Sequence, residues 1–253
     1  FIGIAGHTGS GKSTLIQHLN GLLKPDEGKV LFDGSDIYQE GYSLKELRGK
    51  VGLSFQYPEH QLFEVTVFED VCFGPKNLGL SQEEVKERAR EALQMVGMDE
   101  KYYEKSPFEL SGGQKRRVAI AGILAMHPQY FILDEPTAGL DPIGRDKILE
   151  LLKRLHENQG ITIILVSHSM EEIANYVDRI LVMDQGCLLY DDVPKEVFKH
   201  KEKLEEIGLA VPFYMYLMED LRERGFFEEE VTAITLKEAE DQILKVLKRK
   251  QTL

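Results

Sequence analysis

Residues 6–13 read Gly-His-Thr-Gly-Ser-Gly-Lys-Ser and fit the phosphate-loop pattern G-x-x-x-x-G-K-[ST] at every fixed position. The three glycines are expected to let the backbone adopt positive φ, so that successive N–H groups point inward at an anion. Lys12 should reach the β- and γ-phosphate oxygens, and Ser13 should offer a hydroxyl to Mg²⁺ at the positive end of a helix. The residues predicted to bind the nucleotide are Gly6, His7, Thr8, Gly9, Ser10, Gly11, Lys12 and Ser13.

The sequence on both sides of the loop supports this interpretation. Residues 1–5 form a short apolar run typical of a strand. After the loop, apolar residues recur at helical spacing and predict a helix as far as Leu23; they are Leu15, Ile16, Leu19, Leu22 and Leu23. A glycine-rich turn with an incidental lysine would not need this strand, loop and helix.

Composition limits the remaining possibilities. With 253 residues, 42% of them hydrophobic, the chain can hold one α/β domain and a subdomain. The formal charge of -12 argues against a surface that follows a nucleic acid duplex, so no nucleic acid partner is expected. The longest aliphatic run, residues 161–166, is far shorter than the ~20 residues of a membrane helix, so any membrane role should be peripheral. Cys72 and Cys187 show no metal or redox spacing.

A second candidate residue follows a predicted strand at residues 51–55. Gln56 would lie at the carboxyl end of that strand, where open α/β sheets bind ligands. Its amide could ligate Mg²⁺ or orient water near the γ-phosphate, although a polar residue that merely closes a strand is the simpler alternative. The loop at residues 57–63 is aromatic and contains Pro58, so it is either packed or exposed for a partner.

A helical insert is predicted at about residues 64–125. Ser81 and Glu84 have the spacing of a capping box, and Gly97 should end the helix that follows. Near the end of the insert, residues 110–114 read Leu-Ser-Gly-Gly-Gln. A hydroxyl and exposed amides at a helix start suit an anion, but a capped helix with a basic solvated face at residues 115–117 remains an alternative.

Two acids and a histidine follow later strands. Asp134 and Glu135 end a buried-type strand at residues 130–133, and Asp134 is predicted to hold Mg²⁺ while Glu135 faces the water that attacks the γ-phosphate. Solvated strand termini are the alternative. His168 closes a strand at residues 161–166 and is either a capped core histidine or a bridge between Glu135, water and phosphate.

The end of the chain carries different signals. A β-hairpin is predicted at residues 179–190, and a helix should start at residue 194. From residue 201 onward, charged residues alternate with apolar clusters at 211–217 and 243–247, which suggests helices that pack against another surface of this or a second subunit. The predicted division is a domain at 1–200 and a helical tail at 201–253.

Taken in order, these motifs resemble the nucleotide-binding domain of an ATP-binding cassette (ABC) protein over about residues 1–200. The resemblance implies a P-loop NTPase fold of the α/β class with a mostly parallel sheet, an ATPase activity, and ATP and Mg²⁺ as cofactors. It also implies a site shared by two cassettes, with the signature acting in trans. The implied roles are Walker A for Lys12 and Ser13, Q-loop for Gln56, signature for Ser111, Gly112, Gly113 and Gln114, Walker B for Asp134 and Glu135, D-loop for Asp141, and switch histidine for His168.

Two features depart from that family pattern. The aromatic residue that stacks on adenine would lie upstream of Phe1, in a β-subdomain expected to be truncated here, and we expect the sequence to be part of a longer protein. Residues 138–141, Ala-Gly-Leu-Asp, replace the commoner serine-bearing start of the D-loop.

A narrower resemblance, carried by residues 56–63, residues 73–79 and the tail, is to the ATPase of an energy-coupling factor (ECF) transporter. It implies a subunit peripheral to the cytoplasmic face of the cell membrane. Its partners would be a second ATPase subunit, a membrane scaffold and subunits that capture vitamins or transition-metal ions. The alternative is a soluble ABC ATPase of DNA repair or the ribosome. The compact insert and the single cassette argue against both types, and a GTPase would leave the signature and His168 unexplained.

Overall fold

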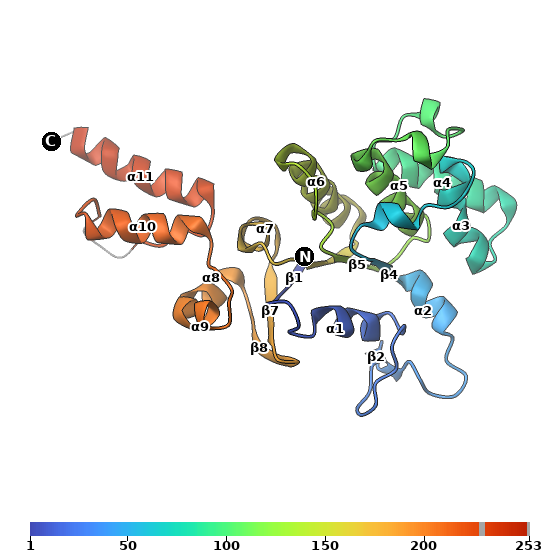
Figure 1. Cartoon of the computed structure of the whole chain (residues 1–253), viewed down its shortest axis with the longest axis horizontal. Coiled ribbons are helices and arrows are strands. Elements are labelled where there is room, and N and C mark those ends of the chain that lie inside the picture. Colours follow the sequence, from blue (N-terminus) through green and yellow to red (C-terminus); the bar gives the residue numbers. More distant parts are fainter. Residues whose placement is uncertain (228–230, 252–253) are drawn as a thin grey trace. The chain divides into compact units, whose positions relative to one another are not determined.

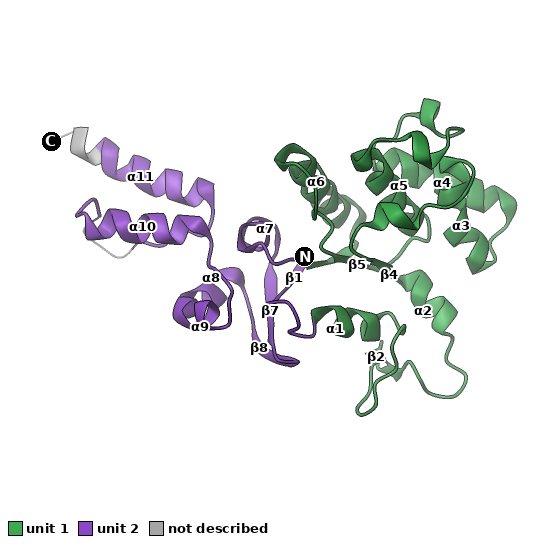
Figure 2. Ribbon diagram, viewed as in Figure 1, with its two compact units in different colours: residues 1, 12–166 green, residues 2–11, 167–253 purple. Residues whose placement is uncertain are grey.

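The computed structural model describes residues 1–227 and 231–251, which form two compact units (Figures 1 and 2). Unit 1 comprises residue 1 and residues 12–166, and unit 2 comprises residues 2–11 and 167–253. Residues 228–230 and 252–253 of the predicted tail lie outside the described residues. Whether residue 200 separates two functional parts stays a prediction.

Three parallel strands form the centre of unit 1. β5 (Tyr130–Asp134) lies between β4 (Val51–Ser54) and β6 (Thr162–Val166). Phe131, Ile132 and Leu133 in β5 are fully buried, as expected of a parallel strand covered on both faces. Because β4 and β5 run in the same direction, the residues that follow them emerge at one edge of the sheet. The strand order thus explains how two segments far apart in the sequence can supply one site.

The predicted helical insert is present in unit 1. Ser81 and Glu84 form the predicted capping box at the start of α4, so this prediction is confirmed. α3 packs closely on α5 at Gly74, where a Cβ atom would lie 3.1 Å from the carbonyl oxygen of Gly122. The helices of unit 1 are α1 (Lys12–Leu19), α2 (Leu44–Lys50), α3 (Val67–Leu78), α4 (Gln82–Met95), α5 (Gly112–Leu124) and α6 (Pro142–Gln159), with short 3₁₀ turns η1 (Pro58–Gln61), η2 (Glu100–Tyr102) and η3 (Pro107–Glu109).

Two element boundaries predicted from the sequence are wrong. The first helix, α1, ends at Leu19, because the chain turns at Gly21 with φ 69°. Leu22 and Leu23 therefore lie outside the helix and are 44% and 39% exposed. The sequence also predicts a strand at residues 29–32, after the turn residues 24–28, but it is reduced to β2 (Leu31–Phe32), since only these residues pair with β3 (Ser35–Asp36).

Unit 2 contains the strand that precedes the phosphate loop. β1 (Ile2–Ala5) pairs in parallel with β7 (Arg179–Asp184), which forms the predicted hairpin with β8 (Cys187–Asp192). The α/β class is therefore confirmed, with parallel pairs predominating in the two units. Unit 2 also holds α7 (Met170–Tyr176), α8 (Pro194–Val197), η4 (Phe198–His200) and α9 (Lys201–Glu206).

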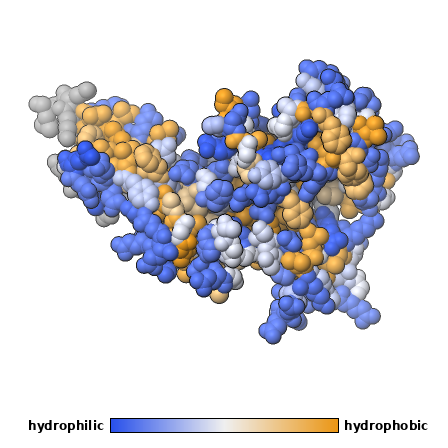
Figure 3. Space-filling view, in the orientation of Figure 1, coloured by the Kyte–Doolittle hydropathy of each residue, from blue (hydrophilic) through white to orange (hydrophobic). Residues whose placement is uncertain are grey.

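The described part of the tail is helical, as predicted, and has a small core of its own. α10 (Phe213–Glu223) packs against α11 (Leu236–Gln251). An ion pair joins Lys201 to Glu219. Hydrophobic side chains also gather on the visible face of these helices (Figure 3). Within the described ranges, no helix combines the length and the hydrophobicity that crossing a membrane requires. The residues of the tail core are Met218, Phe227, Ala233 and Ala239.

Candidate nucleotide-binding and hydrolysis site

The glycines of the phosphate loop are required for two different reasons. Gly9 and Gly11 have φ values of 86° and 99°, in the left-handed region that favours glycine. The expectation of positive φ is wrong for Gly6. A Cβ atom there would instead clash with the Ser10 hydroxyl and lie 2.5 Å from the Met183 carbonyl oxygen. Close packing, not backbone conformation, therefore excludes a side chain at Gly6.

The turn between β7 and β8 supports the same loop. His7 Nε2 lies 3.0 Å from Asp184 Oδ1, and His7 Nδ1 lies 2.6 Å from the carbonyl oxygen of Thr8. The Gly186 N–H donates a hydrogen bond to the carbonyl oxygen of Ser10 over 3.0 Å. The sequence showed Asp184 only as a turn residue, because no local pattern links it to a loop 177 positions away.

Lys12 and Ser13 begin α1 in unit 1, next to the acids that follow β5. Lys12 is buried, and this burial lowers its pKa, while the charges of Glu135 and Asp134 act in the opposite direction. The Ser13 hydroxyl donates a hydrogen bond to Asp134 Oδ2 over 3.1 Å. Burial raises the pKa of Asp134, and the hydrogen bond from Ser13 opposes that shift. A cation at this point would stabilise the ionised carboxylate.

The oxygen atoms of Ser13 and Asp134 fit Mg²⁺. This ion prefers hard oxygen ligands and is commonly held by one or two carboxylates together with substrate phosphates. Within the described part of the chain, no group of three or more His, Cys, Asp or Glu residues could hold a metal ion. A Mg²⁺ ion at Ser13 and Asp134 would therefore depend on nucleotide oxygens for part of its coordination.

Glu135 and Gln56 meet at the carboxyl edge of the strands. Gln56 Nε2 donates a hydrogen bond to Glu135 Oε2 over 3.2 Å. Glu135 has φ 46°, an unusual conformation for a residue with a side chain. Backbone hydrogen bonds hold it there, from the Glu135 N–H to the Val166 oxygen over 3.0 Å and from the Ala138 N–H to the Glu135 oxygen over 3.1 Å. This strained backbone fixes the direction of the carboxylate.

The signature segment forms an exposed helix start. Ser111 caps α5, and the backbone N–H of Ser111 donates to Gln114 Oε1 over 2.9 Å in a capping box. Gly112 and Gly113 are exposed, and a Cβ atom on either would meet nothing within 4 Å, so an anion has room to approach this helix start. This exposed helix start is compatible with a phosphate group contributed by another molecule.

Two further predicted site residues have identifiable local settings. Asp141 caps α6, since its Oδ1 atom accepts a hydrogen bond from the Gly144 N–H over 2.5 Å. His168 is exposed and lies in unit 2 between β6 and α7. Its neighbour Ser167 is buried and donates to Glu172 Oε2 over 2.7 Å. His168 is thus attached to a well-anchored segment and is not a buried core histidine.

Sequence reasoning missed Arg116, the largest fully buried side chain of the described core. Arg116 is 1% exposed, so the interpretation of residues 115–117 as a basic solvated face is wrong at this position. Its Nε and Nη2 atoms donate to Glu59 over 2.9 and 2.6 Å. One signal was available, because Arg116 shares helical spacing with the buried residues Ile120 and Leu124.

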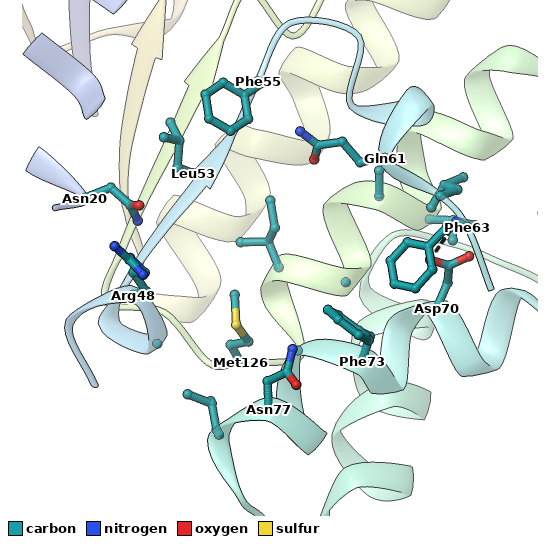
Figure 4. Close-up of a pocket in the computed structure, with 18 of the residues that line it drawn as sticks. Asn20, Arg48, Leu53, Phe55, Gln61, Phe63, Asp70, Phe73, Asn77 and Met126 are labelled. Carbon is teal, nitrogen blue, oxygen red and sulfur yellow. Dashed lines mark hydrogen bonds between the residues drawn. The ribbon is translucent and has the colours of Figure 1, made fainter. Parts of the chain in front are cut away.

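A groove of about 520 Å³ in unit 1 lies beside the loop that follows Gln56 (Figure 4). Phe63 is 58% exposed at its rim and meets Phe73 edge to face at 4.9 Å. The buried Asp70 accepts hydrogen bonds from the N–H groups of Phe63 and Glu64 over 3.4 and 3.0 Å. The other labelled residues that line the groove are Asn20, Arg48, Leu53, Phe55, Gln61, Asn77 and Met126.

Comparisons with known protein sequences identify the family that this chain resembles. The family model of the ABC transporter matches residues 1–138. A protein of Clostridium tetani is 55% identical over 253 residues, which cover 100% of this chain and 88% of that protein. A protein of Caldanaerobacter subterraneus is 57% identical over 248 residues, 98% of this chain and 86% of that protein. Both are named energy-coupling factor transporter ATP-binding protein EcfA2.

Solved structures of ATP-binding cassettes are also similar to this chain. CbiO1 from Clostridium perfringens, part of the ABC transporter complex CbiONQ, matches with a TM-score of 0.72 and 43% identity over 86% of each chain. A dimeric ATP-binding cassette in a post-hydrolysis state with ADP and Pi matches with a TM-score of 0.67 and 34% identity, over 77% of this chain and 85% of that one.

Proposed function

We propose specific roles for the residues described above from one premise, that the chain belongs to the ABC transporter family. It is an ATPase subunit of an energy-coupling factor importer, with the P-loop NTPase fold, and a soluble DNA-repair or ribosomal ATPase is not favoured. The observation that carries the assignment of roles is the meeting of Lys12, Asp134 and Glu135 at one edge of the unit 1 sheet.

The phosphate-binding role belongs to residues 6–13. Backbone N–H groups of this loop and the Lys12 ammonium would bind the β- and γ-phosphates of ATP. Ser13, Asp134 and, when nucleotide is present, Gln56 would hold Mg²⁺. When bound, this ion would neutralise charge that develops on the phosphate oxygens. The Gly9 and Gly11 conformations and the Ser13–Asp134 hydrogen bond support this assignment.

The hydrolytic role belongs to Glu135. Its carboxylate would accept a proton from the attacking water, while Gln56 and His168 would orient that water and the γ-phosphate. The Gln56 amide already lies within hydrogen-bond distance of the carboxylate. A movement of Gln56 towards the γ-phosphate would release one carboxylate oxygen for the water.

We further propose that the site is composite. Ser111, Gly112, Gly113 and Gln114 of a second ATPase subunit would bind the γ-phosphate held by Lys12, and Asp141 would lie at the contact between subunits. The exposed helix start of the signature supports this, since it has room to receive a phosphate from outside. The dimeric state described for a similar cassette agrees.

Dilution tests the composite site. Specific ATPase activity should fall as the protein is diluted through its dimerisation range, because one subunit lacks half of the contacts to the γ-phosphate. Binding of ATP, measured at the same concentrations, should persist through residues 6–13. Constant specific activity at every dilution would contradict the proposal.

The groove of Figure 4 is the proposed attachment point of the membrane scaffold. An apolar helix of the scaffold would contact Phe63, while Gln56, seven residues earlier, responds to the γ-phosphate. The exposure of Phe63 supports this role over simple packing. The subunit would then be peripheral, on the cytoplasmic face, with residues 1–200 as the ATPase domain. The vitamins or transition-metal ions would contact other subunits.

A further inference from the structure

The buried guanidinium of Arg116 joins α5, the helix that carries it, to two other segments of unit 1. Two of its nitrogens, Nε and Nη2, bind the carboxylate of Glu59 in η1. The third, Nη1, donates to the carbonyl oxygens of Pro136 and Ala138 over 2.8 and 2.9 Å. The Arg116 Cζ atom also lies 6.0 Å from the ring centroid of Tyr57. All three nitrogens are therefore engaged.

These contacts reach the two loops that carry the hydrolytic groups. Tyr57, directly after Gln56, has φ 58°, and Glu135 has φ 46°. Each of these left-handed residues begins a loop whose next few residues are fixed by Arg116. Left-handed conformations of non-glycine residues are strained and persist only where surrounding contacts hold them.

The third segment is the signature helix itself. Arg116 lies on α5, five positions after Ser111 and within the same helix. A helix rises 1.5 Å per residue, so Ser111 and Arg116 are separated by about 7.5 Å of stiff backbone. A displacement of the signature would therefore displace the guanidinium, together with the carbonyl groups and the carboxylate bound to it.

We infer that Arg116 is a positioning residue that holds Gln56 and Glu135 in their hydrolytic arrangement and links both of them to the signature segment of the same subunit. A nucleotide bound at the signature then influences hydrolysis at the subunit's own phosphate loop. Lysine cannot replace this arginine, because an ammonium lacks the planar fork that binds a carboxylate and two carbonyl groups at once. The inference rests on the proposed role of Glu135.

The test is a steady-state ATPase measurement on the full chain in the transporter complex. Arg116→Lys should lower kcat about 10- to 100-fold, the range expected when a catalytic group moves by about 1 Å. KM for ATP should stay within about twofold, because the phosphate loop is unchanged. Glu59→Gln should lower kcat less, and adding it to Arg116→Lys should cause little further loss, since both act through one contact.

Controls separate positioning from folding. Arg179→Lys removes an equivalent forked contact between the exposed residues Arg179 and Asp191 of unit 2 and should leave kcat unchanged. Arg117→Lys tests the same helix one residue further on. Thermal unfolding and the number of ATP-binding sites give the folded fraction, to which every kcat is normalised. The inference would be overturned if Arg116→Lys had a reduced folded fraction but native kcat per folded molecule. It would also be overturned if KM for ATP rose by the same factor by which kcat fell.

Glu135→Gln distinguishes the two proposals. If that variant hydrolyses ATP at the native rate, the role of Glu135 fails, and the inference fails with it. If Glu135→Gln is inactive while Arg116→Lys keeps native kcat and KM, only the positioning role of Arg116 is overturned.

Discussion

The side-chain amide of Gln56 donates a hydrogen bond to the carboxylate of Glu135 across 3.2 Å, although the two residues are 79 positions apart. The contact exists because β4 and β5 are parallel neighbours whose carboxyl ends meet. It means that Gln56 cannot move towards a nucleotide without changing the hydrogen bonding of Glu135. The residue expected to sense the γ-phosphate is therefore in direct contact with the residue expected to act on water.

Glu135→Gln should abolish most hydrolysis while preserving ATP binding. Loss of a general base costs about 10²- to 10⁴-fold in rate. Lys12, Ser13 and Asp134 are unchanged, so the variant should accumulate as an ATP-bound dimer. Phosphate release and gel filtration with ATP measure the two effects. Glu150→Gln, an exposed acid on α6, is the control; native hydrolysis by Glu135→Gln would contradict the assignment.

Ser13→Ala should weaken the response to Mg²⁺. The substitution removes the hydroxyl that lies 3.1 Å from Asp134, one of the oxygen atoms expected to ligate the ion. The Mg²⁺ concentration for half-maximal ATPase activity should rise about tenfold, and chelation should abolish the native activity. Thr14→Ala, at the next and exposed position of α1, is the matched control. An unchanged Mg²⁺ titration would exclude Ser13 as a ligand.

Phe63→Ser should uncouple transport from hydrolysis. Phe63 is mostly exposed at the groove, so its loss should leave nucleotide binding and the ATPase activity of the isolated subunit intact. Transport by the reconstituted complex should fall. Tyr57→Ser should instead lower stability, because Tyr57 stacks on His60. Leu188→Ser removes an equally exposed apolar side chain from β8 and serves as the control.

Full transport by the double variant Tyr57→Ser, Phe63→Ser would eliminate the coupling role of this loop. A loss of transport that is matched by a loss of nucleotide binding would indicate packing instead.

Local chemistry explains which features the sequence could predict. The phosphate loop, the Ser81 capping box and the strand ending at Asp134 each depend on residues within a few positions of one another. The end of α1 was overestimated because apolar spacing continues to Leu23 beyond the turn at Gly21. The dipeptide Asn20-Gly21 is a local turn signal, so this boundary could have been predicted from the sequence.

Long-range contacts could not be predicted in the same way. Glu59 and Arg116 are 57 positions apart, and each residue alone resembles an ordinary surface charge. The carbonyl groups of Pro136 and Ala138 carry no side-chain signal at all. The supporting contacts of the site therefore required the structure, whereas its principal residues did not.

Leu244→Glu with Leu247→Glu should weaken the nucleotide-free dimer. Both leucines are partly exposed on α11, so charges there should disturb an interface and leave the tail core intact. Light scattering without nucleotide should show a shift towards the monomer. Thr232→Glu adds a charge at another exposed position of the tail as a control. If the tail only covers its own cassette, neither these substitutions nor complete deletion of residues 201–253 would change the dimer, and that result would contradict the prediction.

At acid pH, the stability of unit 1 should depend on whether the carboxyl group of Glu59 is ionised. Burial alone would raise the pKa of Glu59, but the hydrogen bonds from Arg116, a backbone hydrogen bond and the nearby positive charge of Arg116 together hold the pKa below its ordinary value of 4.5. The resulting stability is present above pH 4.5 and is lost as the pH falls through the lowered pKa. Urea midpoints between pH 3 and pH 7 should fall less steeply for Glu59→Gln than for the native chain. If the urea midpoints of Glu59→Gln and of the native chain fell in parallel with pH, the prediction would be contradicted.

The burial of Arg116 also determines how α5 must be rotated about its own axis when the protein folds. Residues 115–117 are three consecutive cations, and only the middle one has a carboxylate and two carbonyl groups to receive it. Successive helical residues differ by about 100° in direction, so a shift of one residue would place Lys115 or Arg117 against these acceptors and leave Arg116 misdirected. The ion pair thereby favours one rotation of the signature helix about its axis, in addition to the burial of its apolar residues.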